Sequence, residues 1–278
     1  MLLRSGPVLL LLTARAAMAQ TDFYNPDRGR PLLIEDATTI EYQSFEFQMA
    51  PLRLERENGG KYSWGLEPEL AWGVFKRTQL EFGVPIAIID KAGRPVQRGV
   101  AGLDVELMHN LNVESLALPA LTIGVSSLLP VGDLGPRTAY GRVKGIATRT
   151  LGMAGRLHVN AEATAGPRAT ALGGVTGGTT AGPSGLELAR WMAGAAFDRA
   201  LPARSVLLMA EAYARQPLDP ARPREWTAGA GLRWQVGPQF VLDAAAGRRF
   251  TGTEQAWYLT IGTAYAFGIA RFVPLARP

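Results

Sequence analysis

The ionisable side chains of this 278-residue sequence are sorted by sign along the chain. The acidic group comes first and consists of Glu67, Glu69, Glu81, Asp104 and Glu106. The basic group follows and consists of Arg142, Lys144, Arg156, Arg190 and Arg233. If the two groups faced one another across a cavity, their field would orient dipolar solutes and select ions. The alternative is that these charges pair and fill the interior as a polar core.

Catalytic chemistry would have to use His109 or His158, the only two histidines. A histidine can activate a nearby hydroxyl as a nucleophile. However, no serine occupies the neighbouring positions of equal parity around His158, which lies beside Asn160. His109 has the opposite parity and lies near the end of its segment. We therefore predict that the protein is not an enzyme and that His158 is a polar interior residue.

The composition also argues against cofactors and metals. The sequence has no cysteine, which excludes thiolate metal sites and a cysteine nucleophile. No spacing of His, Asp and Glu suggests a metal centre. The glycine-rich stretch "GGVTGGTTAGPSG" (173–185) lacks the Gly-Lys-Ser/Thr ending of a phosphate-binding loop. We predict no catalytic residues, no cofactor and no metal.

The elements that carry these residues alternate with a period of two. In "YSWGLEPELAWGV" (62–74), large apolar residues such as Trp64, Leu66 and Leu70 share one parity, while Glu67 and Glu69 take the other. This period is typical of β-strands, and no stretch keeps a helical period over three turns. In a soluble sheet the apolar face would be a core, whereas in a membrane barrel it would face lipid.

Strand number and connection lengths favour the membrane barrel. About twelve segments alternate, and many have ten residues or more, close to the roughly 9–11 that a tilted strand needs to cross a bilayer. Short connections alternate with long ones, as expected for periplasmic turns and extracellular loops, whereas a β-sandwich has no reason to sort its loops this way. No segment approaches the roughly 20 apolar residues of a membrane-spanning helix. We predict an all-β, antiparallel transmembrane barrel of about twelve strands over residues 38–272.

The tryptophans support the same interpretation. All six share the apolar parity, and most lie near a strand end: Trp64, Trp72, Trp191, Trp226, Trp234 and Trp257. Aromatic girdles at the two lipid interfaces would place them in this way. A hydrophobic core would explain their parity but not their positions along the strands. We therefore predict that they are interfacial aromatics.

The N-terminus has the three parts of a secretory signal peptide. A basic residue, Arg4, precedes an apolar run, and small residues end at Ala19, so we predict a signal peptide over 1–19 with cleavage near Ala19. A short helix is the alternative. Residues 20–37 are predicted to be a periplasmic lead-in, flexible or plug-like, and 273–278 a C-terminal tail. Cleavage would lower the net charge from +5 to about +3, and no basic cluster indicates nucleic acid.

Three stretches resemble a known family of Gram-negative outer-membrane proteins. They are "YSWGLEPELAWGVFKRTQLEFGVPI" (62–86), "GLDVELMHNL" (102–111) and "SSLLPVGDLGP" (126–136). Through them the chain resembles the meta-pathway phenol-degradation-type, transporter-like outer-membrane β-barrels. The resemblance implies an envelope protein that moves hydrophobic or aromatic compounds, and it implies no catalytic residues.

The leading interpretation is an outer-membrane channel or transporter for small solutes, hydrophobic or aromatic ones among them. Loop 163–186 or the N-terminal lead-in would gate it. A non-conducting structural or surface-interaction barrel is the alternative, and a lipid-modifying enzyme is the third. The partners we expect are outer-membrane lipid, a small-molecule solute and the outer-membrane assembly machinery, with no nucleic acid.

Overall fold

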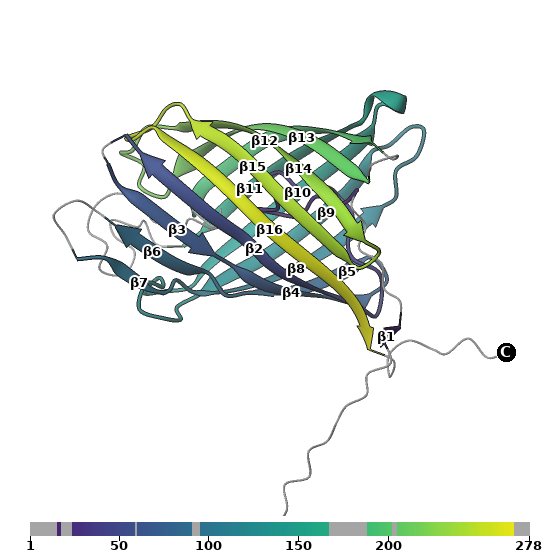
Figure 1. Ribbon diagram of the computed structural model, residues 1–278, viewed down its shortest axis with the longest axis horizontal. Helices are drawn as coiled ribbons and strands as arrows, with labels where there is room; N and C mark the ends of the chain where they lie inside the picture. The colour runs from purple at the N-terminus through teal and green to yellow at the C-terminus, as the bar shows by residue number, and fades with distance from the viewer. Residues whose placement is uncertain are drawn as a thin grey trace, which may run out of the picture.

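The computed structural model describes residues 16–17, 24–58, 60–90, 95–166, 188–201 and 205–269. These residues form a barrel, closed by the pairing of the first long strand, β2 (Ser44–Glu57), with the last, β16 (Ala256–Ile269) (Figure 1). A two-residue strand, β1 (Ala16–Ala17), pairs with the end of β16. Most of the expected signal peptide (1–19), the tail (273–278) and most of loop 163–186 lie outside the described residues.

Among the described residues, twelve antiparallel strands form the wall, as the sequence predicts. After β2, three positions in the wall are each filled by two consecutive strands: β3 (Tyr62–Leu66) with β4 (Pro68–Phe75), β5 (Thr78–Gly83) with β6 (Ile86–Asp90), and β7 (Gln97–Val100) with β8 (Leu103–Asn112). The remaining positions are filled by single strands: β9 (Ala120–Leu129), β10 (Tyr140–Thr150), β11 (Arg156–Ala165), β12 (Ala189–Leu201), β13 (Val206–Pro217), β14 (Glu225–Gly237), β15 (Phe240–Arg249) and β16. One 3-10 turn, η1 (Gly152–Ala154), connects β10 to β11.

In the part of the chain that the structure describes, no helix has the length and apolar character needed to cross a membrane.

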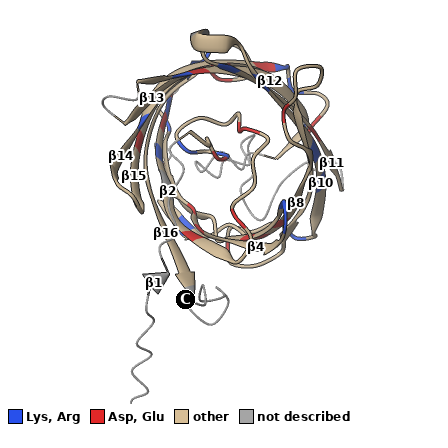
Figure 2. Ribbon diagram, turned by 90° about the vertical axis from the view of Figure 1, so that its right-hand side faces the viewer, with Lys and Arg blue, Asp and Glu red and all other residues tan. Residues whose placement is uncertain are grey.

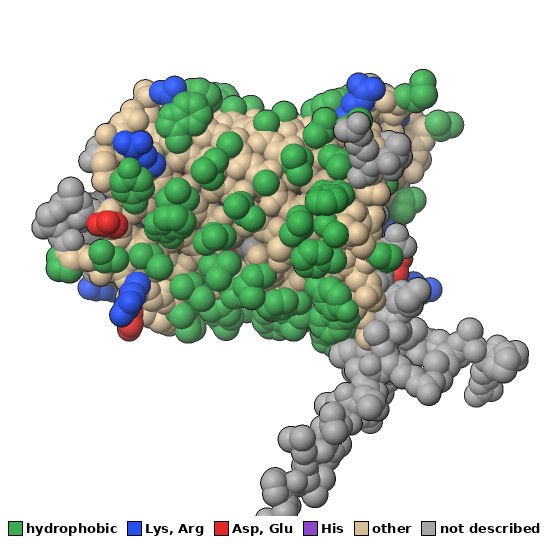
Figure 3. Space-filling model, viewed as in Figure 1, with side chains coloured by type: hydrophobic (Ala, Val, Ile, Leu, Met, Phe, Trp, Pro, Cys, Tyr) green, Lys and Arg blue, Asp and Glu red, His purple; other side chains and the backbone are tan. Residues whose placement is uncertain are grey.

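The faces of the strands are inverted relative to a soluble protein. Along β11 the buried side chains are polar, as at His158 and Asn160, while Leu157 and Val159 are exposed. Apolar side chains are spread over the outer surface along the strands (Figure 3). A polar interior with an apolar exterior is the arrangement expected of a barrel surrounded by lipid.

The three split positions are broken at neighbouring places in the wall. The breaks fall at Glu67, at Val84–Pro85 and at Ala101–Gly102, and Pro68 begins the strand after the first break. Proline has no backbone N–H and cannot complete a ladder. Single hydrogen bonds still cross this region, from Val84 N to the Pro68 carbonyl (3.0 Å) and from Ala101 N to the Pro85 carbonyl (2.7 Å). The wall therefore stays connected, but Glu67 lies outside the regular ladder.

The tryptophans lie on the outer surface. Four of them, Trp64, Trp226, Trp234 and Trp257, are exposed. Trp72 is half-buried and stacks on Phe45 of β2, with ring centroids 5.7 Å apart. Trp191 is half-buried beneath the Arg224 guanidinium, 5.2 Å from its ring centroid. Their role at lipid interfaces stays a prediction.

A tight approach between β15 and β16 provides a test of this packing. At Gly247 an added Cβ would lie 2.3 Å from Cζ of the Tyr258 ring, so we expect Gly247→Ala to destabilise the barrel by roughly 1–3 kcal/mol. Gly145→Ala is the matched control, because a Cβ there would have no atom within 4 Å. Urea unfolding in detergent, followed by tryptophan fluorescence, measures both variants. Equal midpoints for the two would contradict the expectation.

Candidate functional site

The lumen contains residues 24–40, which we call the inner segment (Figure 2). It is not a wall strand, because its one bridge, Asp27 with Arg30, lies within the segment. Of the lead-in expected over 20–37, residues 24–37 thus run inside the barrel, in the plug-like arrangement. Residues 41–43 then lead into β2.

Apolar residues anchor the middle of the inner segment. Leu32, Leu33 and Ile34 are at most 5 % exposed. Leu33 and Ile34 pack in a cluster that includes Met192 and Tyr213, while Leu32 packs against Leu207 and Met209. A small apolar core therefore lies on the β12–β13 side of a lumen that is otherwise mostly polar.

Side chains of the wall satisfy the backbone of the inner segment. Oε2 of Glu211 accepts hydrogen bonds from the backbone N–H groups of Leu33 (2.8 Å) and Ile34 (2.9 Å). Asn160 accepts one from Glu35 N (2.9 Å) and donates one to the Glu35 carbonyl (2.8 Å). Ala37 N donates to Oγ1 of Thr148 (2.9 Å). Buried backbone groups need such partners, and here inward side chains replace the strand ladder.

Two members of the acidic group pair with two members of the basic group. Asp104 on β8 bonds Arg142 on β10, and Glu106 on β8 bonds Lys144 on β10. These pairs span only the intervening strand β9. At these positions the acidic and basic side chains neutralise one another, as they would if the charged residues filled the lumen as a polar core.

The other basic residues find different partners. Arg156 bonds Asp198 (2.6 Å) on β12 and Asp36 (3.3 Å) of the inner segment. Arg233 bonds Asp243 (2.7 Å) on β15 and also the Arg30 carbonyl (2.8 Å).

Arg190 is half-buried at a register shift near the start of β12, and its guanidinium reaches the Thr164 carbonyl at 3.5 Å. It therefore lies apart from the other basic residues. Asp198 and Asp243, the partners of Arg156 and Arg233, also occupy inward positions in the sequence pattern. The pattern alone does not show which strands are neighbours, so it could not identify these pairs.

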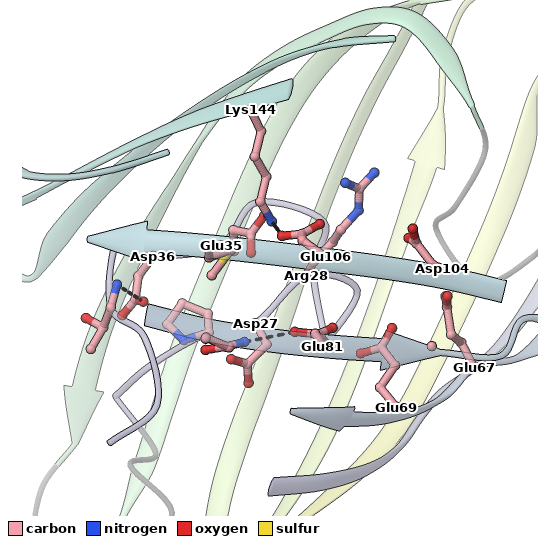
Figure 4. Close-up of a pocket in the computed structure, with 15 residues that line it drawn as sticks. Asp27, Arg28, Glu35, Asp36, Glu67, Glu69, Glu81, Asp104, Glu106 and Lys144 are labelled. Atoms are coloured by element: carbon pink, nitrogen blue, oxygen red, sulfur yellow. Dashed lines mark hydrogen bonds and ion pairs between the residues drawn. The ribbon is translucent and has the colours of Figure 1, made fainter. Parts of the chain in front are cut away.

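Three acidic residues have no cation within salt-bridge distance in the described part of the chain: Glu67, Glu69 and Glu81. They face a small cavity of about 20 Å³ beside the inner segment (Figure 4). Glu81 accepts a hydrogen bond from Gln79 (2.8 Å). A second cavity, of about 190 Å³, lies where the inner segment approaches β2, with Arg30, Glu46 and Arg233 in its lining.

His158 belongs to a hydrogen-bonded chain that the sequence does not reveal. Its Nδ1 lies 3.0 Å from Oγ1 of Thr148, and its Nε2 lies 2.9 Å from Oδ2 of Asp198. Thr148 is directly opposite His158 in the β10–β11 register. The hydroxyl also accepts the Ala37 N–H, and His158 is fully buried. The chain of groups therefore fastens the inner segment to the wall.

His109 Nδ1 lies 2.9 Å from Oγ1 of Thr78 on the neighbouring strand. Within the described ranges, no group of three or more His, Asp or Glu side chains is arranged to hold a metal ion.

No protein-family model and no curated protein matches the sequence. Among solved structures, the chain is similar to the COG4313 outer membrane channel from Pseudomonas putida F1, with a TM-score of 0.57 and 13% identity over 84% of this chain and 98% of that one. Lower scores relate it to the KdgM porin in complex with oligogalacturonate (TM-score 0.45, 11% identity, 80% and 98% coverage) and to the CymD monoaromatic hydrocarbon channel (0.44, 8%, 83% and 89%).

The similarity to the Pseudomonas channel establishes the fold. The chain is an antiparallel β-barrel of the outer-membrane type, with twelve strands and nearly the full extent of that channel. The part of the sequence resemblance that concerns the fold, an outer-membrane β-barrel, is thereby supported.

Proposed function

We propose that the protein is an outer-membrane channel for small solutes whose lumen is closed by the inner segment and opens when that segment moves. The observation that carries this proposal is the way the segment is held. Its hydrogen bonds to the wall go to side chains, while the wall strands bond to one another. Moving the segment would therefore leave the barrel ladder intact, as a membrane-spanning wall requires.

The contacts also suggest that the closed state dominates at rest. Burial of an aliphatic side chain contributes roughly 1.5–3 kcal/mol, and Leu32, Leu33 and Ile34 are all buried. The polar contacts add less, because water in an open lumen would replace most of those hydrogen bonds. A few kcal/mol in favour of closure would make openings rare but accessible.

The lining of the lumen favours polar solutes. Acidic, basic and amide side chains dominate the inward positions of β8, β10 and β11. Transport of hydrophobic or aromatic compounds, and membership of the meta-pathway phenol-degradation-type family, rest on the three sequence stretches. Residence in a Gram-negative outer membrane after cleavage near Ala19, and insertion by the assembly machinery, belong to the same proposal.

A non-conducting structural barrel is the second candidate. The observation that favours it is the breadth of the contacts, since the inner segment bonds to side chains of many wall strands: β2, β5, β8, β9, β10, β11, β13, β14 and β16. A permanent filler would be held in this way. The two candidates differ in whether the segment can move.

The hold of Glu211 on the inner segment can be tested directly. Glu211→Ala removes the acceptor of two buried N–H groups, so we expect the segment to be released more easily, by roughly 1–3 kcal/mol. Hydrogen exchange of peptides covering residues 30–37 should speed up, while exchange in β9 and β10 stays unchanged. Glu254→Gln, in the connection between β15 and β16, is the control. Unchanged exchange at 30–37 would show that Glu211 does not hold the segment.

A reversible lock tests gating itself. The chain has no native cysteine, and Ala37 N lies 2.9 Å from the Thr148 side chain, so Ala37→Cys with Thr148→Cys places a disulfide within reach. In planar bilayers we expect current steps under reducing conditions and none under oxidising conditions, because the disulfide fixes the segment in the lumen.

The two single-cysteine variants are the controls, and their current should not depend on redox conditions. Silence of wild type and of the double variant under all conditions would favour the structural barrel. Equal current in the oxidised and reduced states would mean that the inner segment is not the gate.

A further inference from the structure

The small cavity beside the inner segment is lined by acidic and basic side chains of the wall and of the inner segment, and three of its carboxyl groups come from two neighbouring strand positions. Glu67 lies in the break between β3 and β4, Glu69 lies on β4, and Glu81 lies on β5 (Figure 4). Glu67 is 2 % exposed, and its Oε1 has no hydrogen-bond partner in the described part of the chain. A buried carboxylate oxygen without a partner loses its hydration and gains nothing in return. Such an atom points to a ligand.

In the described part of the lumen, the cations around the cavity form ion pairs with other acids, and none of them lies within salt-bridge distance of these three carboxyl groups. Arg28 bonds Glu162, Arg142 bonds Asp104, and Lys144 bonds both Glu35 and Glu106. Glu67, Glu69 and Glu81 therefore bring three carboxyl groups without a cation partner together at one place in a lumen whose other charged side chains are largely paired.

Gly83 on β5 keeps the cavity open. An added Cβ there would lie 3.0 Å from Oε1 of Glu67 and 3.2 Å from Cγ of Glu69. The space of about 20 Å³ is close to what one water-sized group needs. A guanidinium, a quaternary ammonium or an aromatic cation would be too large.

We propose that Glu67, Glu69 and Glu81 bind one compact cation, the primary ammonium group of a solute. An ammonium group offers three N–H donors on a body the size of water, and three carboxylates can accept them in charge-assisted hydrogen bonds. A multidentate metal site is disfavoured, since no such arrangement exists among the described residues. This inference deepens the proposed function, on which it rests, by naming small primary amines as the solute class.

Binding to the closed protein tests the site without any need for conductance. Equilibrium dialysis of labelled methylammonium against the detergent-solubilised full chain should give one saturable site. Glu67→Gln should weaken binding about tenfold or more, because it removes the charge of the unpartnered acceptor. Gly83→Ala should weaken it comparably while all three charges remain, because the added methyl group occupies the space. Asp133→Asn, on the exposed 130–139 connection, is the control and should bind as wild type does.

Competition with other cations shows which kind of cation the site binds. Unlabelled ethylamine should displace methylammonium, whereas tetramethylammonium, which is bulky and has no N–H, should not. Displacement by potassium at the same concentration as ethylamine would assign the site to inorganic ions and overturn the ammonium proposal. The lack of a saturable site in wild type would also overturn the proposal. Unchanged binding in Gly83→Ala would overturn it too, and this variant provides the test if Glu67→Gln fails to fold. Binding without current in bilayers would refute the channel but leave the site standing.

Discussion

Pairing of every backbone N–H and C=O within the wall is the constraint on which the rest of this structure depends. Hydrocarbon offers no hydrogen bonds, so spanning strands must close, and here β16 closes on β2. Because the barrel closes with its apolar side chains outward, the polar side chains of each strand face the lumen. The interior then cannot be stabilised as a soluble core is, and its buried polar atoms need partners across a space too wide for the wall strands alone.

The inner segment supplies many of those partners. Its backbone bonds Glu211, Asn160 and Thr148, and its charged side chains pair with acids and bases of the wall. The lumen is thus a polar core built largely from hydrogen bonds and ion pairs, with a small apolar cluster at Leu32–Ile34. Individually such polar contacts contribute little net free energy, because water competes for each of them. A segment held in this way can be stable inside the lumen and still be displaced. A wall strand cannot be displaced without breaking its hydrogen bonds to both neighbouring strands.

Sequence periodicity predicts the barrel because parity and strand length are local properties. Trp64, Trp226 and Trp257 are exposed on the outer surface, and Glu67 and Asp104 are buried in the lumen. Pairing is not local. That Asp104 meets Arg142 across β9, and that Thr148 lies opposite His158, depends on register, which a single sequence does not determine. The sequence left open whether the lead-in is flexible or plug-like, because a segment with proline and no period does not indicate whether it lies inside a barrel.

The break between β3 and β4 explains why Glu67 lacks a partner in the wall. Within a regular strand, an inward residue has cross-strand neighbours at fixed spacing, so a charge can be matched by the residue opposite or diagonal to it. Glu67 lies between β3 and β4, next to Pro68 and across from the Val84–Pro85 break, where that regular spacing is lost. Gly83, at the end of β5, offers no side chain to fill the gap. The same backbone irregularity therefore removes the partners of Glu67 and creates the space beside it. Among the described residues, most other buried charged side chains have an ion-pair partner through at least one atom. The arrangement at Glu67, which lacks both a cation partner and a filling side chain, is best explained by a partner that arrives from solution.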